Sequence, residues 1–171
     1  MGVRNYLLEG VSGTGKTSVG RELERRGYQV VHGDRELAYQ GDPFSGERRE
    51  GVTGVAVHEH HLWCVEKVRA LVVDHSHSVT FFCGGSRNFP EFIDLFDGVF
   101  VLTVDRSTLM RRLDQRDETE WGGRGRWEER ELIERLHRTE VDLPAAGVRI
   151  DASLALSRVV DEILLATSSS C

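Results

Sequence analysis

Short runs of apolar, β-branched and aromatic residues recur along the chain and are separated by longer polar stretches. They cover residues 5–9, 28–32, 78–83, 98–104 and 148–151. Their length and content are typical of β-strands. The runs "SVTFFC" (78–83) and "GVFVLTV" (98–104) are apolar almost throughout, which favours strands that are buried on both faces of a sheet.

Between these runs the apolar residues recur at helical spacing. In residues 55–73, for example, Leu62, Val65 and Val72 fall near one helix face. We expect helices at Lys16–Arg26, 55–73, 90–96, 106–116, 128–141 and 154–166. Because strands alternate with helices, the pattern predicts an α/β fold whose parallel sheet is covered by helices on both faces.

The size and composition narrow the class of protein. A chain of 171 residues is expected to form one domain, residues 1–171. The net charge of −6 argues against broad nucleic-acid binding, so local positive charge must hold any phosphate ligand. No apolar run is long enough to span a membrane. The cysteines are odd in number and lack a C-x-x-C pair, which indicates reduced thiols in a cytoplasmic protein: Cys64, Cys83 and Cys171.

The first strand is followed by "GVSGTGKT" (10–17), which fits the pattern Gly-x-x-x-x-Gly-Lys-Thr. In a strand–turn–helix setting, such a loop wraps phosphates with backbone N–H groups at a helix N-terminus. Lys16 would reach the β- and γ-phosphates, and the Thr17 hydroxyl would ligate Mg²⁺. The alternative is a chance match to four fixed positions. The candidate nucleotide-binding residues are Gly10, Val11, Ser12, Gly13, Thr14, Gly15, Lys16, Thr17 and Ser18.

Four later stretches follow the loop: "CGGSRN" (83–88), "LMRRLDQR" (109–116), "DETEWGGRGRW" (117–127) and "IDAS" (150–153). Together with the phosphate loop, these stretches occur in an order that resembles the order of motifs in the small P-loop kinases. This group comprises adenylate kinase and its nucleoside monophosphate relatives, with shikimate and gluconate kinases as near relatives. The resemblance implies a three-layer P-loop NTPase fold and a five-stranded parallel sheet in the order 2-3-1-4-5. It also implies ATP and Mg²⁺ as cofactors.

The resemblance assigns roles to three arginines of the stretches 83–88 and 109–116. Arg87 matches the arginine that contacts the acceptor phosphate in adenylate kinases. Arg112 and Arg116, four residues apart, would share a helix face, with one arginine over the adenine and one on the phosphates. The alternatives are a solvated turn for Arg87 and a solvated basic helix face for the pair.

The segment 117–127 resembles a short mobile lid that would exclude water from the reaction. Arg124 and Arg126 would swing onto the triphosphate, and Arg135 matches the arginine that follows the lid in adenylate kinases. The alternative is a plain surface loop.

The turn at 150–153 resembles the one that passes beside the adenine, so we include Asp151 and Ala152 among the nucleotide-binding residues. A helix N-cap formed by Asp151 or Ser153 is the alternative.

One departure from adenylate kinases redirects the acceptor prediction. Cys83 stands where those enzymes have an aspartate that helps to hold the Mg²⁺ hydration shell. Shikimate and gluconate kinases place an aspartate after the second strand, where "HGDRELAY" offers Asp34 beside Arg35. We therefore expect Asp34 to serve the metal and the acceptor hydroxyl together, with a helix N-cap as the alternative. The loop 40–54, rich in glycine, would close over the acceptor, with Arg48 and Arg49 available for an anionic substrate. Arg35 is a further candidate substrate-binding residue.

These observations predict an ATP-dependent kinase for a small acceptor, more readily a hydroxyl than a phosphate, as a monomer or a homodimer. The expected catalytic residues are Lys16, Asp34, Arg112 and Arg116. A nucleoside monophosphate kinase, an NTP-hydrolysing regulator and a nucleotide-binding module without catalysis stay open. The histidine clusters "HEHH" (58–61) and "HSH" (75–77) lack the His-Glu-x-x-His pattern, so we predict no metal site there.

Overall fold

The computed structural model describes residues 3–169 and is built around a five-stranded parallel sheet. Its strands are β1 (Arg4–Glu9), β2 (Gln29–His32), β5 (Val79–Cys83), β6 (Gly98–Thr103) and β7 (Val148–Asp151). They lie in the order β2-β5-β1-β6-β7. Numbered within this sheet alone, that order is 2-3-1-4-5, so the predicted topology is confirmed. Cys171 lies outside the described residues.

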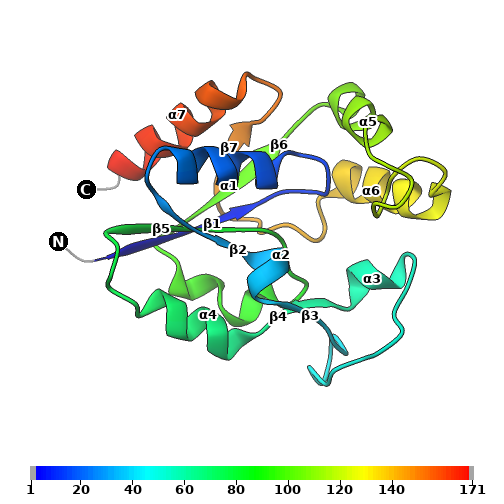
Figure 1. Cartoon of the computed structure of the whole chain (residues 1–171), viewed down its shortest axis with the longest axis horizontal. Helices are drawn as coiled ribbons and strands as arrows, with labels where there is room; N and C mark the ends of the chain where they lie inside the picture. The colour runs from blue at the N-terminus through cyan, green and yellow to red at the C-terminus, as the bar shows by residue number, and fades with distance from the viewer. Residues whose placement is uncertain (1–2, 170–171) are drawn as a thin grey trace.

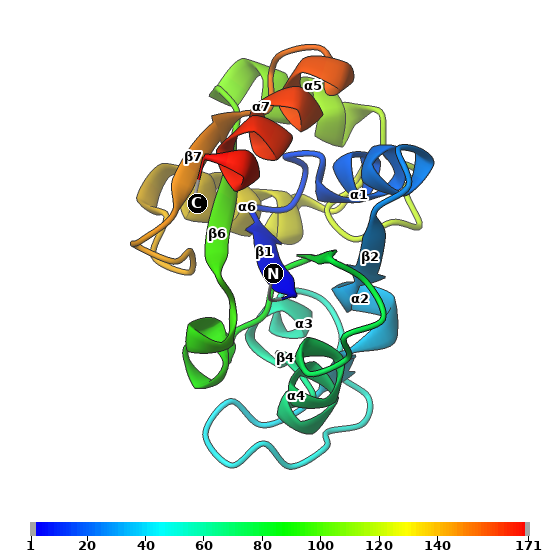
Figure 2. The same ribbon diagram turned by 90° about the vertical axis from the view of Figure 1, so that its left-hand side faces the viewer.

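Helices cover both faces of the sheet, as predicted. Helices α1 (Lys16–Arg25) and α7 (Leu156–Ser168) lie side by side on one face, and α4 (Val65–Val72) lies on the other (Figures 1 and 2). Helices α5 (Arg106–Asp114) and α6 (Trp127–Thr139) stand beyond the carboxyl ends of the strands, next to the loop that leaves β1 (Figure 1).

Successive side chains of each strand point to opposite faces of the sheet, and they contribute to two hydrophobic cores. Tyr6 and Leu8 pack in the core that includes residues of α1 and α7, whereas Leu7 packs in the core beside α4. Phe81 and Phe82 divide in the same way. Because each face of a parallel sheet is covered, consecutive residues of a strand can both be apolar, which explains the unbroken apolar runs in the sequence.

The prediction of one helix over residues 55–73 is wrong. This segment contains a helical turn α3 (Ala56–Glu59), a strand β4 (His61–Trp63) and only then α4. Strand β4 pairs in antiparallel register with β3 (Ala38–Gln40). Trp63 is fully buried and stacks on Phe92, with 5.6 Å between the ring centroids. Pairing with a distant strand therefore overrides the helical spacing of the apolar residues.

Other element boundaries differ in smaller ways. The predicted helix at 90–96 is a pair of 3₁₀ turns, η1 (Phe89–Glu91) and η2 (Ile93–Leu95), where Pro90 removes a backbone donor. A one-turn helix α2 (Gly33–Glu36) follows β2 directly. The segment 41–54 is irregular, as predicted, apart from an isolated bridge between Gly41 and Arg48. None of the helices within residues 3–169 is long and apolar enough to cross a membrane.

Candidate functional site

The loop between β1 and α1 has the geometry that its sequence predicts. Gly13 and Gly15 adopt φ values of 95° and 103°, which residues with a side chain rarely reach. Gly15 is the N-cap of α1, so the first backbone N–H groups of this helix point into the loop. Thr17 and Ser18 are exposed in the first turn of the helix. The loop is therefore shaped to receive an anion.

Lys16 lies over this loop. Its ammonium donates a hydrogen bond to the carbonyl oxygen of Gly10 and another, 3.3 Å long, to that of Val11. Both partners are neutral backbone groups, so the charge of Lys16 is not offset by these contacts. A phosphate group in the loop would supply the missing negative charge.

Arg112 and Arg116 reach the loop from α5 and from the residues just after it. The Arg112 guanidinium donates to the carbonyl oxygens of Thr14 at 2.9 Å and Ala152 at 2.7 Å. The Arg116 guanidinium donates to Ser12 Oγ at 3.1 Å and to the carbonyl oxygen of Trp121 at 2.8 Å.

Both guanidinium groups are partly buried, and burial lowers the pKa of each. Within residues 3–169, neither Arg112 nor Arg116 has a carboxylate partner within 4.0 Å. Other arginines nearby do have one; Arg126, for example, lies 3.0 Å from Glu129. Two partly desolvated cations, neither of which pairs closely with a carboxylate of the described residues, therefore face the same loop.

The loop and the two arginines border a cavity of about 670 Å³, which we call the nucleotide cavity. Leu154, Leu156 and Val159 add apolar surface to its wall. Ala152 lines this cavity, whereas the Asp151 carboxylate accepts hydrogen bonds from the backbone N–H and hydroxyl of Ser153. The alternative that Asp151 or Ser153 caps the following helix is wrong, because the N-cap of α7 is Ala155.

Asp34 lies in α2 at the edge of the nucleotide cavity. Its Oδ1 is 3.0 Å from Nε2 of His61. Partial burial disfavours the charged carboxylate, but the hydrogen bond from His61 and the charge of Lys16 outweigh it, so the pKa of Asp34 lies below its usual value. The helix-cap alternative for Asp34 is wrong, because Asp34 lies inside α2 and the N-cap residue of this helix is His32.

A second cavity of about 280 Å³, which we call the acceptor cavity, is also bordered by residues of the phosphate loop. Ser12, Lys16 and Asp34 border both cavities. The acceptor cavity is lined further by Glu9, Gly10, Val11, Val57, His58, His61, Gly85, Ser86, Arg87, Trp121, Ile133, Leu136, Asp142 and Leu143. The two cavities therefore meet at Ser12, Lys16 and Asp34.

Glu9, at the end of β1, is a residue that the sequence reasoning missed. Its side chain is buried in the wall of the acceptor cavity, and its carboxyl accepts the backbone N–H of Gly10 at 3.2 Å. Burial raises the pKa of Glu9 to about 8, although the charge of Lys16 opposes the shift. A carboxyl group directly before a phosphate loop is the signal that could have identified it.

Asp142, His58 and Trp121 were missed as well. Asp142 Oδ2 lies 3.2 Å from His58 Nε2. The His58 ring stacks on Trp121 with 6.2 Å between centroids. The Trp121 indole N–H also donates to the carbonyl oxygen of Gly54 at 2.9 Å, so this residue joins segment 117–127 to the 40–54 loop.

Of the arginines predicted to bind the acceptor or the triphosphate from the lid, only one borders the acceptor cavity. Arg87 lines the acceptor cavity, but its guanidinium lies 3.7 Å from Asp142. Arg124 and Arg135 are exposed, and neither borders a described cavity. Arg126 donates to the carbonyl oxygen of Glu118 at 2.8 Å instead.

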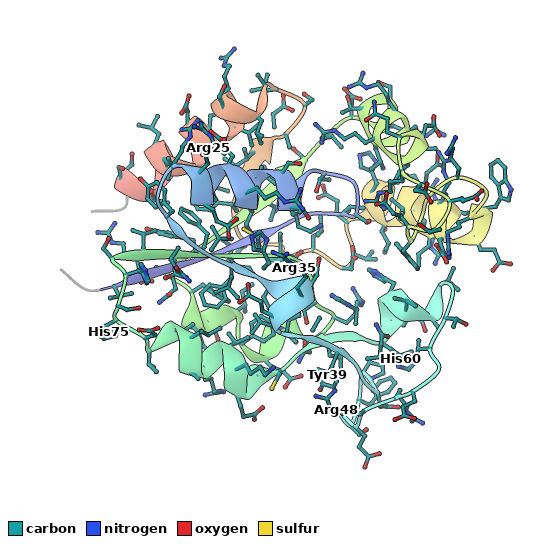
Figure 3. All side chains as sticks on the ribbon, in the orientation of Figure 1. Arg25, Arg35, Tyr39, Arg48, His60 and His75 are labelled. Carbon is teal, nitrogen blue, oxygen red and sulfur yellow. The ribbon has the colours of Figure 1, made fainter. Side chains whose placement is uncertain are left out.

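Other cations lie away from the acceptor cavity. Arg35 is exposed in α2 and lines neither cavity. Arg48 lies over the ring of Tyr39, 5.1 Å from its centroid, and Arg49 pairs with Asp42 at 2.8 Å (Figure 3 labels Tyr39 and Arg48). Both therefore lack the place over an anionic acceptor that the sequence suggested for them.

Cys83, which stands in place of an aspartate, is a buried residue of the sheet core. Burial raises the pKa of its thiol far above the usual value, so the sulfur is protonated at neutral pH. It therefore cannot replace the missing carboxylate.

Thr17 and Asp34, which both carry side-chain oxygens, border the nucleotide cavity. Mg²⁺ in phosphate sites is held by one or two protein oxygens, with phosphates and water as the other ligands. These residues fit that mode. No group of three or more histidine, cysteine, aspartate or glutamate side chains in the described chain forms a cage of protein ligands for a metal.

Comparison with known proteins decides the family. Residues 7–137 match the model of an AAA domain family, AAA_18. The chain belongs to this family. The matched segment of this AAA domain includes the phosphate loop, Asp34, Arg87 and both arginines at the nucleotide cavity. No curated protein sequence matches the chain.

The fold of this AAA domain protein is that of the small P-loop kinases. A shikimate kinase from Bacteroides thetaiotaomicron matches with a TM-score of 0.58 and 16% identity, over 96% of this chain and 98% of that one. A gluconokinase from Sinorhizobium meliloti 1021 matches with a TM-score of 0.52 and 20% identity, over 95% of this chain and 90% of that one. A deoxyadenosine kinase from M. mycoides with bound dATP matches with a TM-score of 0.53 and 16% identity, over 96% of this chain and 99% of that one.

Proposed function

We propose that the protein transfers the γ-phosphoryl group of ATP to the hydroxyl group of a small acceptor. The observation that carries this proposal is the junction of the two cavities, where Lys16 and Asp34 belong to both walls. A site for hydrolysis alone needs only the nucleotide cavity. A second cavity that ends at the same lysine and carboxylate is expected of an enzyme that brings two substrates together.

In this proposal, positioning and electrostatics lower the barrier. Lys16 leaves its backbone partners to bind the β- and γ-phosphates. Arg112 and Arg116 offset charge on the triphosphate from the opposite side, and Arg112 also braces the turn at Ala152. Thr17 and Asp34 would hold Mg²⁺, which when bound offsets phosphate charge.

Asp34 prepares the acceptor. Its lowered pKa keeps the carboxylate ionised at neutral pH, so that it can accept a hydrogen bond from the acceptor hydroxyl. The hydroxyl oxygen then attacks the γ-phosphorus, the bond to the β–γ bridging oxygen breaks, and the hydroxyl proton passes toward Asp34. His61, 3.0 Å from the same carboxylate, holds it in place.

The substitution Asp34→Asn tests this role. We expect kcat to fall by roughly 10²–10⁴-fold, with little change in ATP affinity, because the side-chain shape is kept and the proton acceptor is lost. Asp94→Asn is the matched control, since Asp94 is exposed and borders neither cavity. Steady-state ATP consumption with the best acceptor and calorimetry with ATP measure the two quantities. Wild-type turnover in Asp34→Asn would overturn the proposed role.

A further inference from the structure

The charges in the acceptor cavity indicate what kind of acceptor it takes. Four formally charged side chains other than Glu9 line it: Lys16 and Arg87 are positive, and Asp34 and Asp142 are negative. Lys16 belongs to the phosphate loop and is required by the triphosphate. Arg87, the remaining arginine of this wall, already faces Asp142 at 3.7 Å.

The two histidines of the cavity are also placed against carboxylates. His58 lies 3.2 Å from Asp142, and His61 lies 3.0 Å from Asp34. An anionic acceptor would thus find Arg87 and both histidines beside a carboxylate and Lys16 engaged by the triphosphate, and it would be repelled by Asp34, Asp142 and the γ-phosphate. Bringing a negative charge close to carboxylates in a partly desolvated site costs binding free energy.

Asp142 supplies an unused hydrogen-bond acceptor. Its side chain is only 8% exposed, and both charged contacts above use its Oδ2. Its Oδ1 is buried and has no hydrogen-bond partner within residues 3–169. A buried carboxylate oxygen without a partner is costly, so this atom is expected to meet a donor from a ligand.

Glu9 adds a second polar group on the cavity wall. One of its oxygens accepts the N–H of Gly10, and Gly85 leaves it room, since a Cβ at position 85 would lie 3.0 Å from Glu9 Oε2. Apolar side chains complete the wall: Val57, Trp121, Ile133, Leu136 and Leu143. Few polar groups among apolar ones are typical of a site that fixes the orientation of a small organic molecule.

We propose that the acceptor carries no anionic group and that its end remote from the reacting hydroxyl donates hydrogen bonds to Asp142 and Glu9. This inference rests on the proposed kinase function and narrows its acceptor. It assigns Asp142 as a specificity-determining residue and opposes the earlier expectation that Arg87 binds an acceptor phosphate.

A charge-matched panel tests the inference with the full chain, ATP and Mg²⁺. The panel contains uncharged hydroxyl compounds (nucleosides, sugars and polyols), amino sugars as cations, and anions (gluconate, shikimate and nucleoside monophosphates). We expect the highest kcat/KM from an uncharged or cationic acceptor, at least about tenfold above every anion. An anion as the best acceptor would overturn the inference and leave the kinase proposal standing. ATP consumption that no acceptor stimulates would overturn both.

The variant Asp142→Asn gives a second measurement on the best acceptor of that panel. Loss of a charge-assisted hydrogen bond should lower kcat/KM by roughly ten- to a hundredfold. Because the substitution also frees Arg87, the ratio of kcat/KM for anions to that for uncharged acceptors should rise, which a merely structural role would not produce. Asp161→Asn, which removes the carboxylate partner of Arg26 on the surface, is the matched control. An unchanged ratio in a folded Asp142→Asn protein would contradict the assignment.

Discussion

Replacing Glu9 by glutamine should raise the free energy of unfolding at neutral and alkaline pH. The Glu9 side chain is 2% exposed, and burial raises its pKa from 4.5 to about 8. The folded protein therefore binds the proton more tightly than the unfolded chain does. This contribution to stability is complete below about pH 4.5 and is lost as the pH rises toward 8.

The size of the effect follows from the shift. One pKa unit corresponds to about 1.4 kcal/mol, so the wild-type protein should lose roughly 3 kcal/mol through Glu9 between pH 5 and pH 8. Glutamine cannot ionise and keeps an oxygen for the N–H of Gly10. The variant does not lose this contribution. Relative to the wild type, its free energy of unfolding should therefore rise by roughly 3 kcal/mol between pH 5 and pH 8.

Urea denaturation of both proteins at several pH values between 5 and 8 measures the difference. Glu91→Gln, a substitution at an exposed position in η1, is the matched control. The refuting result is a pair of parallel stability curves for Glu9→Gln and the wild type. Glu9 would then be ionised throughout this range, and the wall of the acceptor cavity would carry one more negative charge than we have assigned.

Two further predictions concern the nucleotide side. Lys16→Ala should weaken ATP binding by roughly ten- to a hundredfold in calorimetry, because a charge-assisted hydrogen bond to phosphate is lost; unchanged affinity would remove the basis for the nucleotide site. Backbone hydrogen exchange in 117–127 should slow when an ATP analogue and Mg²⁺ bind, because Arg116, which donates to Ser12 of the phosphate loop, also holds the carbonyl of Trp121. Exchange that is already slow and does not respond would show that this segment is no lid.

The sequence predicted correctly those parts of the structure whose conformation depends on a short, continuous stretch of residues. The phosphate loop needs a strand, glycines and a helix start in one run of residues, and all are present between β1 and α1. The apolar runs gave the parallel strands because each strand is buried on both faces. Arg112 and Arg116 share a helical spacing, and both do reach the loop.

The acceptor cavity could not be predicted in the same way. Glu9, His58 and Asp142 come from three distant parts of the chain, and their contacts depend on how the segment after α6 packs against the sheet. The incorrect prediction of one helix over 55–73 also prevented the placement of His58 and His61 in this cavity, because these residues belong to different elements, α3 and β4. Single carboxylates or histidines carry no local signal of burial, so only their packing identifies them.

The central claim is tested most directly by following the phosphorus atoms of ATP during turnover. Phosphorus NMR of the wild-type protein with ATP, Mg²⁺ and the best uncharged acceptor should show a new phosphate monoester that appears in step with ADP. Asp34→Asn should form it far more slowly. Inorganic phosphate as the only new product would indicate hydrolysis without an acceptor, and a product with a new phosphoanhydride bond would indicate transfer to a phosphate. Either result would contradict phosphoryl transfer to a hydroxyl group at the junction of the two cavities.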